Sequence, residues 1–406
     1  MIRLTTTLGL GCALLVSAPL GALAQVREAD PSEFAAMRLG PVALTPTFAL
    51  RDVGVDTNVF NESEGQRDFT ATFVPGVDAW VRVGGVHFSS ETELEWLYFQ
   101  DTASQRSFSI DQVGAIELPF AYFTPYVSGG YSNLRRRPNF EIDQRVRYIT
   151  TSAAYGVKFY LGPRTRLDIE RRQSRIDYSD EAFGDPALAE SLNRDNTGTE
   201  LAVRYALTAL TTFVTSVTVE EDRFLLSSLR DSDSVSVLAG FEFRPFALIS
   251  GGASVGFRKF ETVEEAVADF DGLVATVDVK WVIRDMTRFI VTVERDTEYS
   301  FELDEPFYVQ TGWSVDARQM VSYNWDIEGS LGQTRLAYQR VQDGPESGAL
   351  QAGRVDRVSM YGAGIGRRFG TELRMGFEVN HARRQSDAPG RSYDGFRIGG
   401  TVTYGY

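Results

Sequence analysis

Cysteine and histidine are almost absent from this sequence. Of its 406 residues one is cysteine, Cys12, and two are histidine, His87 and His381. Disulfides therefore stabilise nothing after residue 12, and two distant histidines do not have the spacing of a zinc site. No Gly-x-x-x-x-Gly-Lys phosphate loop occurs either. We expect no metal, no cofactor and no catalytic residue, and so no enzyme.

The chain also lacks an excess of positive charge and any long apolar run after its first residues. The formal net charge is −14 at pH 7. This balance argues against nucleic acid as a partner, because a protein that follows a phosphate backbone is basic. After Gln25 no apolar run approaches the roughly 18 residues of a membrane-spanning helix. No linker rich in proline, serine or glycine divides the chain into several domains.

The first residues have the pattern of a secretory signal peptide. Arg3 precedes an apolar core from Leu8 to Leu15, and Ala22-Leu23-Ala24 is a small-residue cleavage site. We expect residues 1–24 to be a signal peptide that is cleaved on export. Residues 25–40 show no strand period, and we interpret them as a short periplasmic segment.

Residues 41–406 are dominated by alternation of apolar and polar side chains. From Leu273 to Ile283 the odd positions are apolar, while the even positions include Thr276, Asp278 and Lys280. Period two predicts a strand with one apolar face. One such strand fits a soluble sandwich as well as a barrel whose apolar face meets lipid.

The number and spacing of these segments favour the barrel. About eighteen strand-like segments run from residue 42 to the C-terminus, joined by alternately short and long connections. Short turns such as Gly84-Gly85 contrast with longer, acidic connections such as 261–270, as in barrels with short periplasmic turns and long outer loops. The sequence therefore predicts an all-β fold, a transmembrane antiparallel up-and-down β-barrel of about 18 strands. The basic run Arg135-Arg136-Arg137 is interpreted as a solvated outer loop or, less favoured, as a contact with lipid phosphate or an acidic glycan.

The end of the chain has the features of an assembly signal. Its apolar residues fall on alternate positions up to the last one. The last strand of an outer-membrane barrel closes the cylinder, and its aromatic rings lie at the membrane interface. We expect the barrel-insertion machinery to recognise Phe396, Tyr404 and Tyr406.

Charged residues opposite the apolar face should line a water-filled lumen. The candidates are Glu93, Glu95, Glu242, Asp278, Lys280 and Glu378. Acidic residues lead in this inward series, which predicts a weak preference for cations. His381 continues a lipid-facing series and would suit a lipid-modifying enzyme, but no nucleophile can be assigned to it.

One local motif indicates a resemblance to a known protein family. Gly54, Asp56, Asn58 and Phe60 form a Gly-x-Asp-x-Asn-x-Phe pattern at the end of the first predicted strand. This pattern resembles the putative β-barrel porin 2 family of Gram-negative outer membranes. In physical terms, Asp56 and Asn58 suit capping of backbone groups, and Gly54 suits a kink or bulge.

The resemblance implies an outer-membrane barrel without assigned enzymatic activity, and ties some members to surface polysaccharide. Our leading hypothesis is a porin-like channel for passive, weakly cation-selective passage of small polar solutes. The alternatives are an accessory barrel of surface-polysaccharide export or assembly and, less favoured, a lipid-modifying enzyme. The expected partners are outer-membrane lipid, lipopolysaccharide, the barrel-insertion machinery, and small polar solutes or polysaccharide.

Overall fold

Strands make up nearly all of the computed structural model, which describes residues 35–179, 187–244, 248–341, 352–370 and 372–405. The predicted signal peptide and Tyr406 lie outside these residues. The strands are β1 (Met37–Leu39), β2 (Val42–Asp56), β3 (Asp68–Val83), β4 (Val86–Phe99), β5 (Ser107–Glu117), β6 (Phe123–Arg136), β7 (Val146–Tyr160), β8 (Thr165–Tyr178), β9 (Arg194–Ala206), β10 (Thr211–Phe224), β11 (Ser232–Phe243), β12 (Ile249–Thr262), β13 (Phe270–Ile283), β14 (Thr287–Tyr299), β15 (Phe307–Met320), β16 (Trp325–Gln339), β17 (Ala352–Phe369), β18 (Leu373–Gln385) and β19 (Tyr393–Tyr404). Within these residues, one α-helix, α1 (Leu188–Leu192), and two short 3-10 turns, Ala103–Gln105 and Ser228–Arg230, lie in connections.

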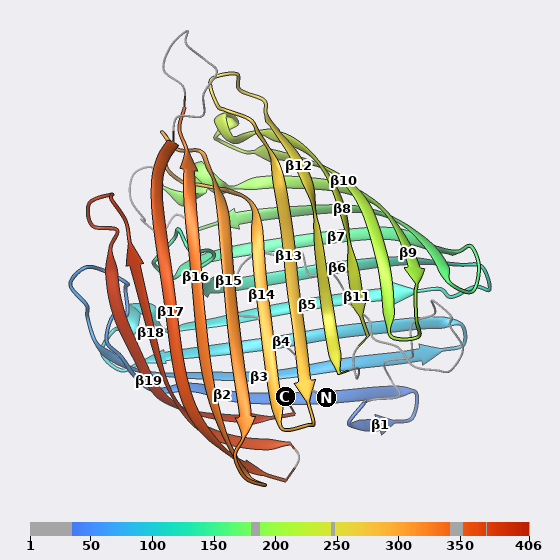
Figure 1. The fold of residues 1–406 in the computed structure, drawn as a ribbon, viewed down its shortest axis with the longest axis horizontal. Helices are drawn as coiled ribbons and strands as arrows, with labels where there is room; N and C mark the ends of the chain where they lie inside the picture. The colour runs from blue at the N-terminus through green and yellow to red at the C-terminus, as the bar shows by residue number, and fades with distance from the viewer. Residues whose placement is uncertain (1–34, 180–186, 245–247, 342–351, 371, 406) are drawn as a thin grey trace.

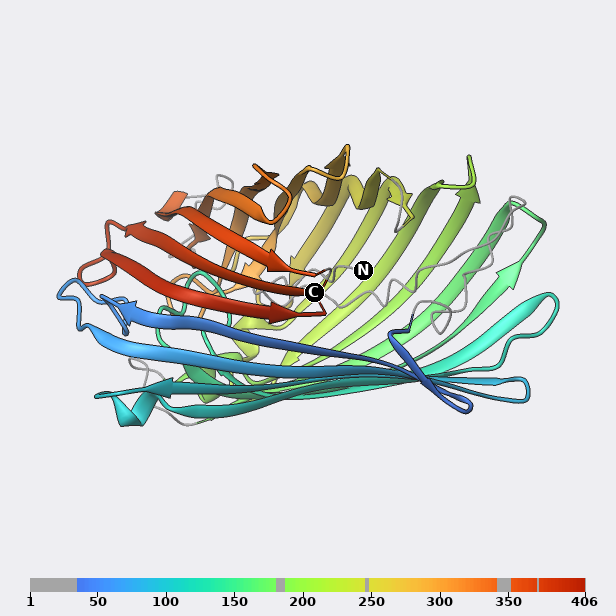
Figure 2. The ribbon, with the colours of Figure 1, turned by 90° about the horizontal axis from the view of Figure 1, so that it is seen from below.

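Each strand from β2 onward pairs antiparallel with the next in sequence, and β19 pairs back onto β2. Eighteen of the described strands, β2 to β19, therefore form one closed barrel, and the predicted fold class is confirmed. In Figure 1 the blue first strands lie beside the red last strands. Figure 2 shows the tilted strands as one continuous curved wall.

A short strand before the barrel was not predicted. Residues 37–39 were assigned to a segment without strand period, but they form β1 and pair with residues 42–44 of β2. Gly40, at φ +62°, provides the reversal between the two strands. A three-residue strand is too short to show an alternation in sequence.

The two faces of the wall are inverted relative to a soluble protein. On β11, Val235, Val237 and Phe241 are more than 40% exposed, while Ser232 and Ser234 are at most 6% exposed. Water would not favour an apolar exterior around a polar interior, but a lipid bilayer does. In the described part of the chain, no helix is long and apolar enough to cross a membrane.

Aromatic residues gather on the outward face at the end with the short turns. They come from strands all around the barrel: Phe88, Phe123, Tyr205, Trp281, Trp325, Phe369 and Tyr404. Such a girdle marks the boundary between the hydrocarbon core and water. Tyr404 thus lies where an interface aromatic is expected.

The connections differ between the two ends of the barrel. Turns such as 84–85 and 284–286 join strands at the end where β2 begins and β19 finishes. Longer connections, such as 137–145 and 263–269, lie at the other end, which we call the loop end. Both barrel termini are therefore on the short-turn side.

Candidate functional site in the barrel lumen

The residues predicted to line the lumen fall on the polar, inward alternation of their strands, and all are half-buried. Three of them meet cations: Glu95 lies 3.8 Å from Arg51, Glu242 lies 3.2 Å from Arg204, and Glu378 lies 3.7 Å from Arg374. Within the described residues, no ion pair involves Glu93, Asp278 or Lys280. The lumen wall therefore holds both paired and unpaired charges.

Arginines on the inward face of β8 and β9 were missed by the sequence analysis. Arg166 lies 2.9 Å from Asp168, and Arg204 pairs with both Asp168 and Glu242. These ion pairs connect β8, β9 and β11 across the wall. The alternation in the sequence of β8 could have predicted them, because Arg166 and Asp168 lie two residues apart and therefore on the same face of the strand.

A second charged cluster lies across β15 to β18. Arg374 lies 2.8 Å from Asp326, which is fully buried, and 3.0 Å from Glu328. Arg318 and Arg368 approach the same carboxylates, Arg318 at 2.7 Å from Glu328 and Arg368 at 3.5 Å from Asp326. Charges so arranged hold neighbouring strands in register and leave the surrounding lumen polar.

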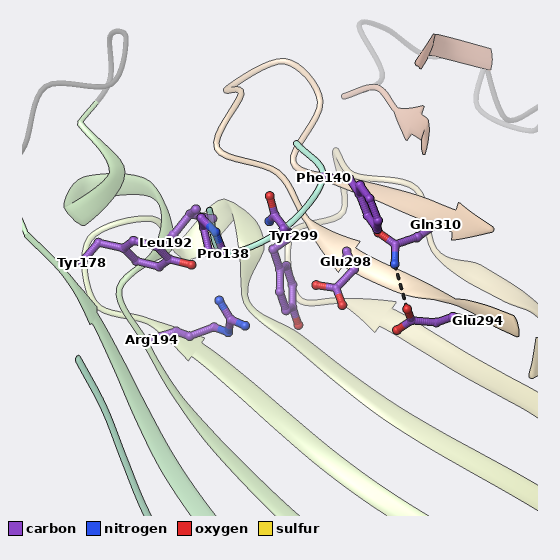
Figure 3. A pocket seen from close by; sticks show the side chains of 10 residues that line it. Pro138, Phe140, Tyr178, Leu192, Arg194, Glu294, Glu298, Tyr299 and Gln310 are labelled. Carbon is purple, nitrogen blue, oxygen red and sulfur yellow. Dashed lines mark hydrogen bonds between the residues drawn. The ribbon is translucent and has the colours of Figure 1, made fainter. Parts of the chain in front are cut away.

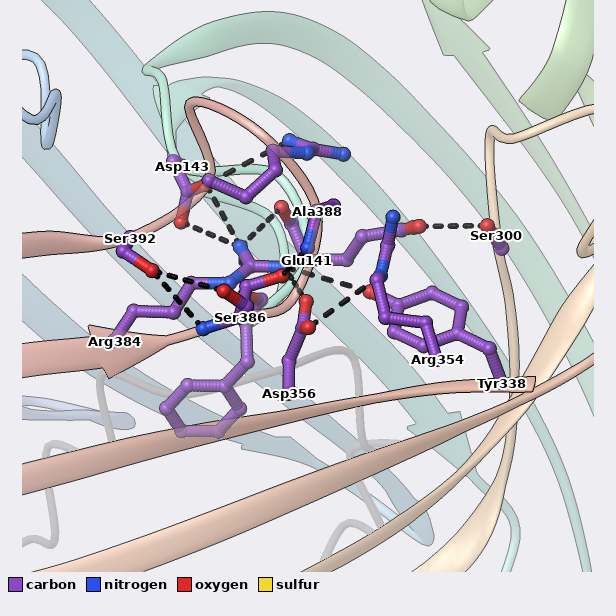
Figure 4. Close-up of polar contacts among 12 residues, drawn as sticks. Glu141, Asp143, Ser300, Tyr338, Arg354, Asp356, Arg384, Ser386, Ala388 and Ser392 are labelled. Atoms are coloured by element: carbon purple, nitrogen blue, oxygen red, sulfur yellow. Dashed lines mark hydrogen bonds and ion pairs between the residues drawn. The ribbon is translucent and has the colours of Figure 1, made fainter. Parts of the chain in front are cut away.

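The connection 137–145 between β6 and β7, which we call the inner loop, folds into the barrel. Glu141 and Ile142 are fully buried. The Arg384 guanidinium of β18 donates to Asp143 at 2.7 Å and to the Glu141 carbonyl at 2.9 Å, and it also pairs with Asp356 of β17. Figure 4 shows Arg384 between these acceptors. The loop thus reaches strands far from its own on the barrel wall.

The expected solvated loop at Arg135-Arg136-Arg137 is therefore wrong. Arg135 and Arg136 belong to β6, and Arg137 donates to the Val59 carbonyl at 2.9 Å within the loop end. Burial lowers the pKa of Arg137. The sequence shows three exposed-looking charges, but Arg137 donates to the Asp143 carbonyl of the inner loop and to the Val59 carbonyl, which is 78 residues away.

An apolar cluster lies against the inner loop. Ile142 packs with inward rings of the strands and with α1 of the β8–β9 connection, together with Tyr148, Tyr178, Leu188, Leu192 and Phe301. Figure 3 shows the cavity lined by Phe140, Arg194, Glu298 and Tyr299 beside this cluster. Its volume of about 30 Å³ admits one or two water molecules and no larger solute. The loop end of the lumen is thus narrowed by packed side chains.

Burial controls the ionisation of the inner loop. It raises the pKa of the Glu141 carboxyl to about 7, while Ser300 donates to that carboxyl at 2.6 Å and opposes the rise. It also raises the pKa of Asp143, although Arg384 favours the charged form. Burial, with the nearby Arg137 and Arg397, lowers the pKa of Arg145 to about 9. Docking of the loop is therefore linked to proton binding.

The Gly-x-Asp-x-Asn-x-Phe motif lies at the seam where β2 meets β19. A Cβ atom on Gly54 would lie 1.9 Å from the Ile398 carbonyl oxygen, so no side chain fits there. The Asp56 carboxylate accepts the Asn58 backbone N–H at 2.9 Å. The Asn58 amide donates to the Glu62 carbonyl at 2.7 Å and to the Asp394 carbonyl at 3.0 Å.

Phe60 completes the same segment, because it packs against a buried cluster of Val59, Leu97 and Phe99. All four motif residues thus contact the seam or the first loop. These are structural contacts of the kind that hold a strand end in place.

The two histidines lie at opposite ends of the barrel. His87 is at the short-turn end of β4, and His381 is near the loop end of β18. His381 faces outward, lies 3.0 Å from Asp394, stacks on Tyr361 and packs against the tilted ring of Phe396. No group of three His, Cys, Asp or Glu side chains suited to a metal ion occurs within the described ranges.

A family model described as putative beta-barrel porin 2 matches residues 130–406, which is more than half of the chain. The chain belongs to this porin family. The family inferred from the first-strand motif is thereby confirmed, although the match begins after that motif. Family membership and the inverted barrel agree that the protein is a porin-like barrel of the outer membrane.

Solved barrels of low sequence identity resemble this porin-family chain. OpdK of Pseudomonas aeruginosa, solved with vanillate, is 12% identical, with 89% of this chain and 98% of that one covered and a TM-score of 0.46. A BenF-like porin of Pseudomonas fluorescens is 12% identical, with coverages of 90% and 98% and a TM-score of 0.46.

A bacterial polysaccharide outer membrane secretin is 10% identical, with coverages of 90% and 99% and a TM-score of 0.35. At such scores these likenesses carry no argument about function. No curated protein matches the chain.

Proposed function

We propose that this protein is a narrow diffusion channel for small polar solutes in the outer membrane of a Gram-negative bacterium. The observation that carries the proposal is the lumen wall, where charged side chains of many strands surround an interior narrowed by the inner loop. A barrel of this strand number leaves an aqueous channel unless something fills it. We propose no catalytic role.

The unpaired charges of the lumen support a weak preference for cations. Paired charges largely cancel, so the field comes from groups without an ion pair. Among the inward strand residues that the structure describes, these include five acids and three bases: Glu93, Glu200, Asp278, Glu294 and Asp316 against Arg136, Lys280 and Arg288. Negative groups along a pore favour cations.

Purified protein in planar bilayers tests both parts of this proposal. We expect single-channel conductance, and a reversal potential in a salt gradient that favours cations. The preference should weaken in Asp278→Asn and should fade near 1 M salt, where the screening length is about 3 Å. Thr276→Asn, at the preceding inward position, is the neutral control. Reproducible anion preference in dilute salt would overturn the charge argument.

The filled loop end favours one alternative, an accessory barrel of surface-polysaccharide export or assembly that does not conduct by itself. Arg384→Ser separates the two functions, because it removes the cation that binds the inner loop to β17 and β18. A channel should conduct more in this variant than in wild type or in the outward-facing control Arg383→Ser. If neither wild type nor Arg384→Ser conducts, the accessory barrel is favoured.

A further inference from the structure

Three outward-facing arginines cluster near the loop end of adjacent strands. Arg335 of β16 is directly opposite Arg357 of β17, and Arg383 of β18 is opposite Ser359, two residues along β17. All three are exposed. Strand neighbours in such direct and diagonal positions lie within reach of long side chains. We call Arg335, Arg357 and Arg383 the arginine triplet.

The triplet lacks the acidic partners that several other outward cations of this barrel have. Arg175 pairs with Asp195 at 2.7 Å, Arg223 pairs with Asp233 at 2.6 Å, and Lys259 pairs with Glu261 at 2.6 Å. Within the described residues, no ion pair or hydrogen bond of a side chain involves the triplet. Asp394 of β19 lies directly opposite Arg383, but its carboxylate is 3.0 Å from the His381 ring and forms no ion pair with Arg383.

The register fixes the height of the triplet on the wall. Leu331 and Tyr361 form a directly opposed pair, each at least half exposed, on the lipid-facing surface. The next outward pair toward the loop end is Gln333 and Ser359, and the one after it is Arg335 and Arg357. The surface thus changes from apolar to polar to cationic within four residues, as at the edge of a bilayer where headgroups begin.

We propose that the arginine triplet binds the phosphate groups of a glycolipid in the outer leaflet. Like charges directly opposite each other on a sheet destabilise it unless a counter-charge lies between them. A phosphate supplies that charge, and the planar guanidinium matches its oxygens with two parallel hydrogen bonds. Lipid is the partner because the triplet continues the lipid-facing band on the same strands. The inference does not depend on transport.

Native mass spectrometry of the purified full-length barrel with added lipid A carrying two phosphates tests the site. The double variant Arg335→Ser/Arg357→Ser should bind this lipid at least about tenfold more weakly than wild type, since two charge-assisted hydrogen-bond donors are lost. The matched control Arg175→Ser/Arg223→Ser removes two outward arginines that already have acidic partners, and it should stay within about twofold of wild type. Lipid A stripped of its phosphates should bind wild type and double variant equally.

Each other outcome counts against the proposal. Equal affinity of wild type and double variant, or an equal loss in the control, would overturn it. Inorganic phosphate that displaces the lipid at equal concentration would show a free anion site and would overturn the assignment to lipid. Heat-modifiable migration reports folding of each variant. If the serine variant does not fold, Arg335→Lys/Arg357→Lys keeps the charge but loses the paired donors, and undiminished binding by it would also reject the site.

Discussion

Val277 and Thr276 are neighbours on β13, and the alternation of the strand places their side chains on opposite faces of the wall. We expect Val277→Arg to reduce stability by about 2–4 kcal/mol, the cost of a cation on the lipid face near the midplane. Thr276→Arg faces the lumen and should cost much less. Urea unfolding in lipid vesicles measures both. Similar losses for the two variants would mean that the faces are assigned incorrectly.

Gly54 allows the close approach of β2 and β19 at the seam because it has no side chain. Its position leaves no room for a Cβ atom beside Ile398 and Gly399. Gly54→Ala should therefore destabilise the closed barrel by about 1–3 kcal/mol, as overpacking does, and lower the heat-modifiable fraction. Gly400→Ala is the matched control on the other side of the seam, because a Cβ atom there would meet its nearest neighbour at 3.7 Å. Equal behaviour of the two variants would rule out a special role for Gly54.

At the scale of elements, the docked inner loop should respond to pH through Glu141. Its pKa is raised from 4.5 to about 7 by burial, so the docked form is favoured fully below about pH 4.5 and loses this stabilisation as pH rises through 7. Arg354, Arg384 and Arg391 face the same carboxylate and limit the effect. Amides of residues 137–145 should exchange hydrogen faster at pH 8 than at pH 5, after correction for intrinsic rates.

Two variants isolate the titrating group in that measurement. Glu141→Gln cannot ionise and should remove the pH dependence. Glu302→Gln changes a carboxylate of the same cluster that is one-third exposed, and it should leave the dependence in place. A pH response that survives in Glu141→Gln would assign the titration to another group, such as Asp143.

The strands were predictable from sequence because their physics is local. The alternation around Asp278 and Lys280 is visible in a dozen residues, and the barrel places both side chains on the inward face. The inner loop was not predictable, because Phe140 to Asp143 show no period. Their partner Arg384 is one of many arginines and lies more than 240 residues away. Likewise, the ion pairs of Arg204 depend on strand register, which sequence alone does not determine.

For the whole molecule, the alternation of connection lengths predicts how the barrel is oriented. Single cysteines at Glu265 and Asp304, in long connections, should react with a membrane-impermeant reagent on intact cells. Cysteines at Gly162 and Asp285, in short turns, should react only after the outer membrane is opened. The natural chain has no cysteine after residue 12, so only the introduced cysteine can be labelled there. Equal labelling of both groups on intact cells would contradict this orientation. Gly184 and Gly344, which the same alternation places in two further long connections, lie outside the residues that the structure describes.

The anchoring of the inner loop has a consequence for the order in which the molecule assembles. Asp143 is made early, but Arg384, which binds it, follows 241 residues later and belongs to the next-to-last strand. Because Arg384 is held on β18, its contact with Asp143 forms only once that strand has joined the wall. Docking is therefore among the last events of folding. In the channel we propose, each newly made copy would pass through an interval in which the wall is closed and the inner loop is not yet docked, so the pore would be widest before the protein reaches its final state.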